Sequence, residues 1–200
     1  MKLFGKYYID IKSMFKKGVK KIEEPFAVFL VCGRMGSGKT YFCTKYASEH
    51  CLEYKIKTNI HSLNIPKANI QYFTELSEIY NDTEEYTMYI IDELGKKFTK
   101  DSKPDKDFYN FLQHSRKSKR IVFMIHQEYY QTPYWLRGPV SQVFTTEKIP
   151  ILPLFCTSKG IPYLEEDTKE WNIEPTELYI YKRNKSISSY YNTFESVAVL

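Results

Sequence analysis

Cysteine is scarce in this sequence of 200 residues, and its positions do not match a metal site. The spacings lack the C-x-x-C or Cys/His pattern of a zinc site. His50 and Cys51 are neighbours in sequence, so their side chains would diverge on a helix. We therefore expect reduced core thiols in a cytosolic protein. The four cysteines are Cys32, Cys43, Cys51 and Cys156.

Long hydrophobic runs are also missing. The longest apolar run is too short to cross a bilayer, and the N-terminus lacks the apolar centre of a signal peptide. We expect no transmembrane segment. The length suits one α/β domain with a sizeable core. The net charge of +5 fits a polyanionic partner, although it also fits an ordinary basic protein.

Glycine is sparse too, yet three of the eight glycines lie in Gly33-Arg34-Met35-Gly36-Ser37-Gly38-Lys39-Thr40. This segment matches G-x-x-x-x-G-K-[ST], the Walker A pattern, and follows the apolar run 26–32. Such a loop, with a helix over 40–51 behind it, directs backbone N–H groups from Gly33 to Tyr41 at phosphate oxygens. Lys39 should reach the β- and γ-phosphates of ATP, and the Thr40 hydroxyl should ligate Mg²⁺.

A second acidic element follows the apolar run 88–91, where Asp92 and Glu93 are adjacent. The pattern resembles a Walker B strand, a buried parallel strand that delivers a carboxylate beside the P-loop. Asp92 is then the metal-side carboxylate, and Glu93 is the general base that polarises an attacking water. This pair favours hydrolysis over transfer to a bound acceptor, and so a motor over a small-molecule kinase.

The remaining chain divides into a basic lead-in (1–24), an ATPase core (25–148) and a C-terminal extension packed on the core (149–200). In the lead-in, aromatic and apolar residues recur at helical spacing among lysines. A helix there could touch a membrane or DNA, or pack on the domain or on a neighbouring subunit. The fold class that follows is α/β, with a parallel sheet flanked by helices and a small C-terminal β extension.

Further elements are expected along the core and extension. Strands are predicted at 54–60, 121–125 and 178–181, and helices at 74–80, capped by Thr74, and at 108–118. The polar segment 96–107 reads as a loop, and Pro150, Pro153 and Pro162 read as an irregular connection. Tyrosines interleaved with Lys182, Arg183 and Lys185 could stack on DNA bases, but we prefer a strand packed on the domain.

The sequence resembles the FtsK/HerA group of P-loop motors in three features. These are the P-loop, the segment Tyr89–Glu93, and an apolar strand that ends before Gln127, with Arg116 eleven residues earlier. Within that group, residues 26–147 resemble the zonular occludens toxin (Zot) family, the assembly ATPases of filamentous phages. The resemblance implies a RecA-like fold and a ring, expected to be hexameric. It also implies that Gln127 senses the γ-phosphate and that an arginine enters a neighbour's site.

Alternatives remain for both of those residues. Gln127 could be a polar cap at a strand end, although an amide there can bond both water and γ-phosphate. Arg116 is our first choice for the arginine finger, in a run of residues 114–120 that would otherwise be a solvated basic face. Arg120 and Arg137 are the other candidates.

The resemblance implies an ATP-hydrolysing motor for viral DNA packaging or for virion assembly and extrusion. Zot-type ATPases commonly carry a transmembrane helix and an outer domain after the ATPase region; this sequence has neither, which leaves room for genome packaging by an icosahedral virus. The expected partners are viral DNA, bound through its phosphates, further copies of the chain, and membrane or virion assembly proteins. The expected location is the host cytoplasm, at the virion or membrane periphery. The alternatives are an ATP-dependent assembly scaffold or switch and a small-molecule phosphotransferase.

Overall fold

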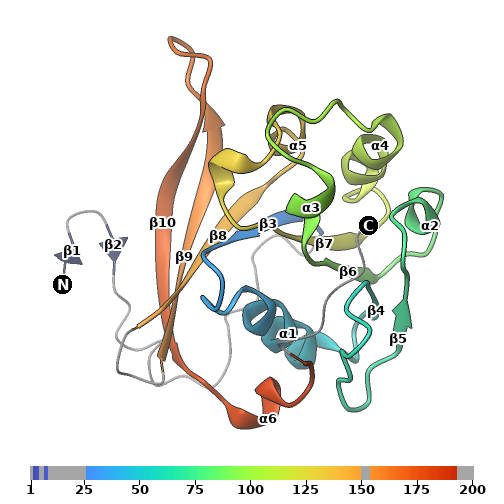
Figure 1. Cartoon of the computed structure of the whole chain (residues 1–200). Coiled ribbons are helices and arrows are strands. Elements are labelled where there is room, and N and C mark those ends of the chain that lie inside the picture. Colours follow the sequence, from blue (N-terminus) through green and yellow to red (C-terminus); the bar gives the residue numbers. More distant parts are fainter. Residues whose placement is uncertain (1, 5–6, 9–25, 150–153, 193–200) are drawn as a thin grey trace.

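A computed structural model describes residues 2–4, 7–8, 26–149 and 154–192 of the chain. A mostly parallel sheet of eight strands forms its centre, in the order β10-β9-β8-β3-β7-β6-β4-β5 (Figure 1). The parallel strands are β3 (Val28–Cys32), β4 (Lys55–Thr58), β5 (Ile70–Tyr72), β6 (Thr87–Ile91), β7 (Arg120–Ile125) and β8 (Gln142–Lys148).

Helices cover both faces of the sheet (Figure 1). One face carries α1 (Lys39–His50) and, beside its start, the short α6 (Lys185–Ser188). The other carries α2 (Ser77–Tyr80), α3 (Leu94–Lys97), α4 (Lys106–His114) and α5 (Tyr134–Arg137), with a 3₁₀ turn η1 at Tyr129–Gln131. None of the described helices combines the length and the apolar character needed to span a membrane.

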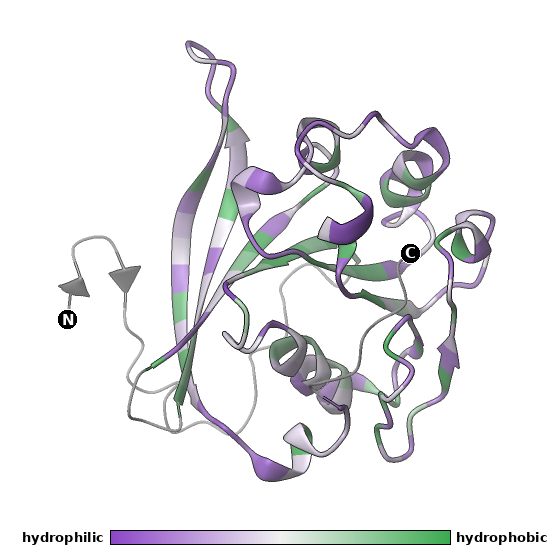
Figure 2. Cartoon of the chain, viewed as in Figure 1, coloured by the Kyte–Doolittle hydropathy of each residue, from purple (hydrophilic) through white to green (hydrophobic). Residues whose placement is uncertain are grey.

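Two hydrophobic cores fill the spaces between sheet and helices. Alternate residues of β3 serve the two faces: Phe29 and Val31 pack toward α1, while Val28 and Leu30 pack toward the other helices. The central strands are hydrophobic along most of their length (Figure 2). This composition is typical of parallel strands buried on both faces, and the predicted α/β P-loop fold is confirmed.

The C-terminal part adds two long antiparallel strands, β9 (Leu154–Leu164) and β10 (Trp171–Lys182), to the edge of the sheet beside β8. They form a hairpin that projects past the helices (Figure 1). Pro162 was expected in an irregular connection, but it lies within β9 opposite Ile173. The pairing of β9 with β8 ends at Gly160, so no β8 partner is lost when Pro162 lacks an N–H.

Several local expectations were wrong in detail. Helix α2 starts at Ser77 rather than after Thr74. The Glu78 carboxylate in its first turn accepts the N–H groups of Thr74 and Glu75, which precede the helix, at 2.8 Å. The predicted loop 96–107 begins inside α3 and ends inside α4. Of the lead-in, β1 (Lys2–Phe4) and β2 (Tyr7–Tyr8) form short antiparallel strands instead of helix. Residues 9–24 lie outside the described residues.

Candidate active site

The P-loop connects β3 to α1 and is shaped by glycines at positive φ. Gly38, at φ 97°, is the N-cap residue of α1. A β-carbon there would lie 2.8 Å from the Phe155 ring, and one on Gly33 would collide with the Thr146 carbonyl oxygen. Only glycine fits such positions. Arg34, Met35 and Gly36 are exposed at the tip of the loop, with their backbone accessible.

A cavity lies beside the P-loop, and Lys39 and Thr40 line it from the first turn of α1. The Lys39 ammonium donates to the carbonyl oxygens of Gly33 at 2.8 Å and Arg34 at 3.2 Å, which holds it over the loop. Burial lowers the pKa of Lys39, and the nearby Asp92 carboxylate opposes that shift. The Tyr41 side chain is buried. The group of Tyr41 that can donate a hydrogen bond to a phosphate is therefore its backbone N–H.

Asp92 follows β6 and lies beside Thr40. The Thr40 hydroxyl donates to Asp92 Oδ2 at 2.9 Å, and the Glu93 N–H donates to Oδ1 at 2.7 Å. Burial raises the pKa of Asp92, while these hydrogen bonds and Lys39 oppose the change. A hydroxyl and a buried carboxylate in contact at a P-loop offer Mg²⁺ two oxygen ligands, and phosphate and water oxygens can complete an octahedron. The residues present therefore fit this ion.

Glu93 occupies an unusual backbone conformation at the edge of the same cavity. Its φ of 55° is in the left-handed region, where non-glycine residues are uncommon, at the N-cap of α3. This turn directs the carboxylate into the cavity, where it forms an ion pair with Lys96 one turn along α3. Strained backbone of this kind is frequent at functional sites.

Gln127 follows β7, and its backbone is tied to the P-loop: the Gly33 N–H donates to the Gln127 carbonyl oxygen at 3.0 Å. The side chain is exposed and lines the cavity together with Lys39, Thr40 and Glu93. The preceding residue, His126, is buried beneath the site, with Nδ1 accepting from the Glu128 N–H at 3.3 Å. The carboxyl ends of β3, β6 and β7 thus bring the sequence-predicted residues together at one edge of the sheet.

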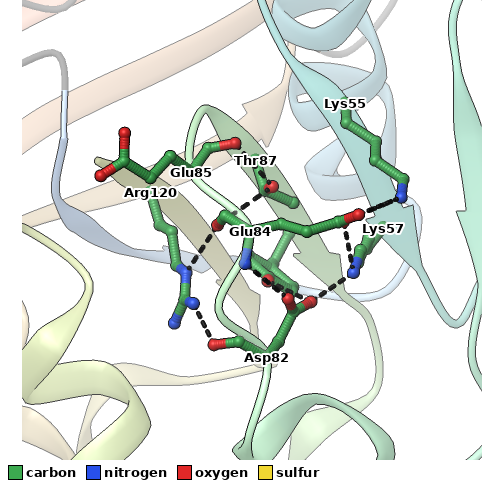
Figure 3. Close-up of polar contacts among 8 residues, drawn as sticks. Lys55, Lys57, Asp82, Glu84, Glu85, Thr87 and Arg120 are labelled. Atoms are coloured by element: carbon green, nitrogen blue, oxygen red, sulfur yellow. Dashed lines mark hydrogen bonds and ion pairs between the residues drawn. The ribbon is translucent and has the colours of Figure 1, made fainter. Parts of the chain in front are cut away.

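The three candidate arginines are in different environments. Arg120 is buried, and its guanidinium donates to the backbone carbonyl oxygens of Asp82 and Glu84 (Figure 3). Arg137 is also buried, donating to the carbonyl oxygens of Thr132 and Tyr130 at 3.0 and 2.9 Å. Arg116 is exposed. It precedes β7, so it lies at the opposite edge of the sheet from the P-loop.

Sequence reasoning missed several residues that support the site. The Asn59 side chain both donates to the Asp92 carbonyl oxygen at 3.0 Å and accepts from the Asp92 N–H at 2.8 Å. Thr146 of β8 bonds Ser37 of the P-loop, hydroxyl to hydroxyl, at 2.8 Å. Asn59 follows β4 and Thr146 lies in β8, so a search for polar residues at the carboxyl ends of all parallel strands would have found both.

Comparisons with known proteins identify the fold. No protein-family model matches the sequence, and no curated protein is significantly similar to it. The N-terminal domain of zonular occludens toxin from Neisseria meningitidis is similar in structure, with a TM-score of 0.59 and 16% identity over 83% of this chain and 98% of that one. The genome packaging NTPase of Sulfolobus turreted icosahedral virus 2, in complex with ATPγS, has a TM-score of 0.51 and 14% identity over 76% and 98%. The chain therefore has the fold of a RecA-like P-loop NTPase.

Proposed function

We propose that the chain binds ATP with Mg²⁺ at the P-loop and hydrolyses it. The contact between Thr40 and Asp92 supports this most directly, because it joins the two expected Mg²⁺ ligands next to Lys39. Mg²⁺ held there would neutralise charge on the β- and γ-phosphates. Other backbone N–H groups of the P-loop bind the phosphates, since those of Gly33 and Ser37 are already paired with backbone carbonyl oxygens. Lys39 moves from the loop carbonyls onto the phosphates.

Glu93 is the proposed general base. Its carboxylate lines the same cavity as Lys39, where it can accept a proton from the attacking water. Gln127, on the neighbouring strand end, orients this water and contacts the γ-phosphate. Lys96 is the ion-pair partner of this carboxylate.

Arg116 is the proposed arginine finger, and it acts in a neighbouring subunit. Arg120 and Arg137 are committed to backbone carbonyl groups of their own chain, which leaves Arg116 as the exposed member of the three. Because the strand after Arg116 runs toward the P-loop edge, Arg116 cannot serve its own site. Shared sites of this kind fit a homo-oligomeric ring, which we propose to be hexameric, as in the FtsK/HerA group.

We further propose that ATP hydrolysis moves viral DNA, in genome packaging or in virion assembly and extrusion. The support is the fold shared with a zonular occludens toxin domain and a viral genome packaging NTPase, together with the net charge of +5. DNA would be bound through its phosphates. The ring would operate in the host cytoplasm at the virion or membrane periphery, with membrane or virion assembly proteins as further partners.

A DNA-stimulated ATPase assay tests this proposal. We expect hydrolysis that single- or double-stranded DNA stimulates regardless of sequence, with a stimulation that falls steeply as salt rises. The folded Lys39→Ala variant is the control for contaminating activity. Hydrolysis that no DNA stimulates, combined with assembly that depends on ATP, would support the scaffold alternative instead.

A further inference from the structure

The cavity at the P-loop extends well past the groups that handle phosphate. It has a volume of about 600 Å³. Its lining includes Glu93 and Gln127, where the γ-phosphate belongs. A further wall is formed by Phe155, Arg183 and Tyr191, which all come from the C-terminal part of the chain. These three residues take no part in the proposed hydrolysis.

The start of this wall is attached directly to α1. The Tyr41 hydroxyl accepts a hydrogen bond of 2.7 Å from the Asn184 N–H, and the Tyr41 ring packs on Phe155 at 5.0 Å and on Tyr181 at 6.1 Å. Tyr41 is the residue after Thr40, so these contacts fix Arg183 beside the P-loop. Ile187 of α6 completes the small apolar cluster with Tyr41 and Phe155.

The other end of the wall is attached to the loop after β4. The Asn64 N–H donates to the Tyr190 carbonyl oxygen at 2.7 Å, and the Asn192 N–H donates to the Ser62 hydroxyl at 2.8 Å. Tyr191 lies between these two hydrogen bonds. We call residues 183–192 the C-terminal strap, because this segment is fixed at both ends and follows one side of the cavity.

The direction of a bound nucleotide follows from the P-loop. Its backbone surrounds the α- and β-phosphates, while the lysine and the Mg²⁺ ligands act toward the γ-phosphate. The γ-phosphate points to Glu93 and Gln127, so the nucleoside must leave the phosphate chain at the other end. The C-terminal strap lines the same cavity and is attached to Tyr41, the residue after Thr40.

We propose that Arg183 and Tyr191 form the nucleoside-binding half of the site and hold the base by stacking. This inference rests on the proposed function, since it assumes a nucleoside triphosphate in the P-loop. A planar guanidinium and a phenol ring are both suited to packing on the face of a base. Burial raises the pKa of Tyr191 to about 12, so its ring is neutral at physiological pH.

Stacking has a consequence for substrate selection. Every base has a π-face, so a site that stacks the base without reading its edge accepts different nucleotides with similar affinity. We therefore expect ATP and GTP to bind with comparable Kd values. The strap tyrosines and Arg183 thus contact the base of a nucleotide rather than the bases of DNA.

Calorimetric titration of the full chain with Mg-ATP and with Mg-tripolyphosphate tests the inference, because tripolyphosphate lacks the nucleoside. Arg183→Ala should weaken ATP binding by about tenfold, the size of a lost stacking contact, and leave tripolyphosphate binding unchanged. Lys185→Ala removes the same charge from the exposed start of α6 and should change neither. Equal weakening of both ligands would assign Arg183 to phosphate, and no weakening of either would remove it from the site; both outcomes overturn the inference.

A pair of variants at Tyr191 separates stacking from folding. Tyr191→Phe keeps the ring and should bind ATP like the wild type, whereas Tyr191→Ala should bind it more weakly with unchanged affinity for tripolyphosphate. Retained tripolyphosphate binding also shows that the P-loop of the variant is folded. Unchanged ATP binding in Tyr191→Ala contradicts the inference. Lys39→Ala should lose both ligands; wild-type protein that binds neither would instead contradict the proposed function, and with it this inference.

Discussion

The Thr40 hydroxyl donates a hydrogen bond of 2.9 Å to the Asp92 carboxylate, joining residues that are 52 positions apart in the sequence. The contact brings the first turn of α1 to the end of β6. It also places a buried carboxylate beside a single lysine, an arrangement that disfavours ionisation of Asp92 until a cation binds. The same residue is thus costly for folding and required for the proposed activity.

Asp92→Asn should therefore stabilise the free protein and abolish its response to Mg-ATP. An amide preserves an acceptor for the Glu93 N–H without a buried charge. We expect the free energy of unfolding at neutral pH to rise by about 0.5 to 2 kcal/mol, the gain commonly seen when a functional residue is relieved of strain. Chemical denaturation with and without Mg-ATP measures both effects. A less stable variant that still gains stability from Mg-ATP would be inconsistent with a metal-ligand role.

Glu93→Gln should bind Mg-ATP and fail to hydrolyse it, because only the proton acceptor is removed. The loss in turnover should be about 10²-fold or more. Rapid filtration or calorimetry measures the bound nucleotide, and phosphate release measures the turnover. Lys96→Ala is a useful companion, since it removes the ion-pair partner but keeps the base. Turnover at the wild-type rate in Glu93→Gln would show that another group is the base.

His126 should make stability depend on pH on the acidic side of neutrality. Burial lowers its pKa below the ordinary value of 6.5, so the folded state holds the ring neutral while the unfolded state protonates first. Its contribution to stability is complete above that value and is lost as the pH falls through the lowered pKa, with a slope of at most about 1.4 kcal/mol per pH unit. Urea denaturation across this range should show a shallower slope for His126→Asn. Parallel curves for the two proteins would refute the prediction.

If Arg116 completes the site of a neighbouring subunit, an Arg116 variant should lower the ATPase activity of wild-type subunits in mixed rings. Arg116→Ala should fold normally and bind ATP but hydrolyse it slowly, because Arg116 is exposed and remote from its own P-loop. A finger supplied by a neighbour commonly changes the rate by about 10³-fold or more. Doping wild-type protein with this variant should depress ATPase activity more than in proportion to its fraction. A strictly linear fall would indicate independent subunits. Poisoning by Arg137→Ala but not by Arg116→Ala would keep the ring and change the finger.

The sequence was informative wherever a function depends on a short local pattern. The P-loop and the Asp92-Glu93 pair directly follow apolar strands, and Gln127 follows another apolar strand after one intervening residue. Parallel strands bring their carboxyl ends to one edge. The fold class and the position of the site therefore followed from local patterns. The roles of Glu93 as base and of Gln127 as sensor stay predictions.

Contacts made by distant segments could not be anticipated in this way. Thr146 and Phe155 press against P-loop glycines from more than a hundred positions away, and Arg183 is placed by the hydrogen bond that its neighbour Asn184 donates to the Tyr41 hydroxyl. None of these residues belongs to a recognisable motif. The Thr74 cap was wrong: α2 begins after Leu76 without a side-chain cap, and the Glu78 carboxylate accepts the N–H groups of Thr74 and Glu75.

The central claim is that Lys39 and its loop bind and hydrolyse Mg-ATP. Steady-state ATPase activity of purified wild-type protein and of Lys39→Ala, with circular dichroism to verify the fold, tests it most directly. We expect Mg²⁺-dependent hydrolysis by the wild type that falls by about a hundredfold or more in the folded variant, since the cation on the β- and γ-phosphates is lost. Undiminished hydrolysis by a well-folded Lys39→Ala protein would contradict it.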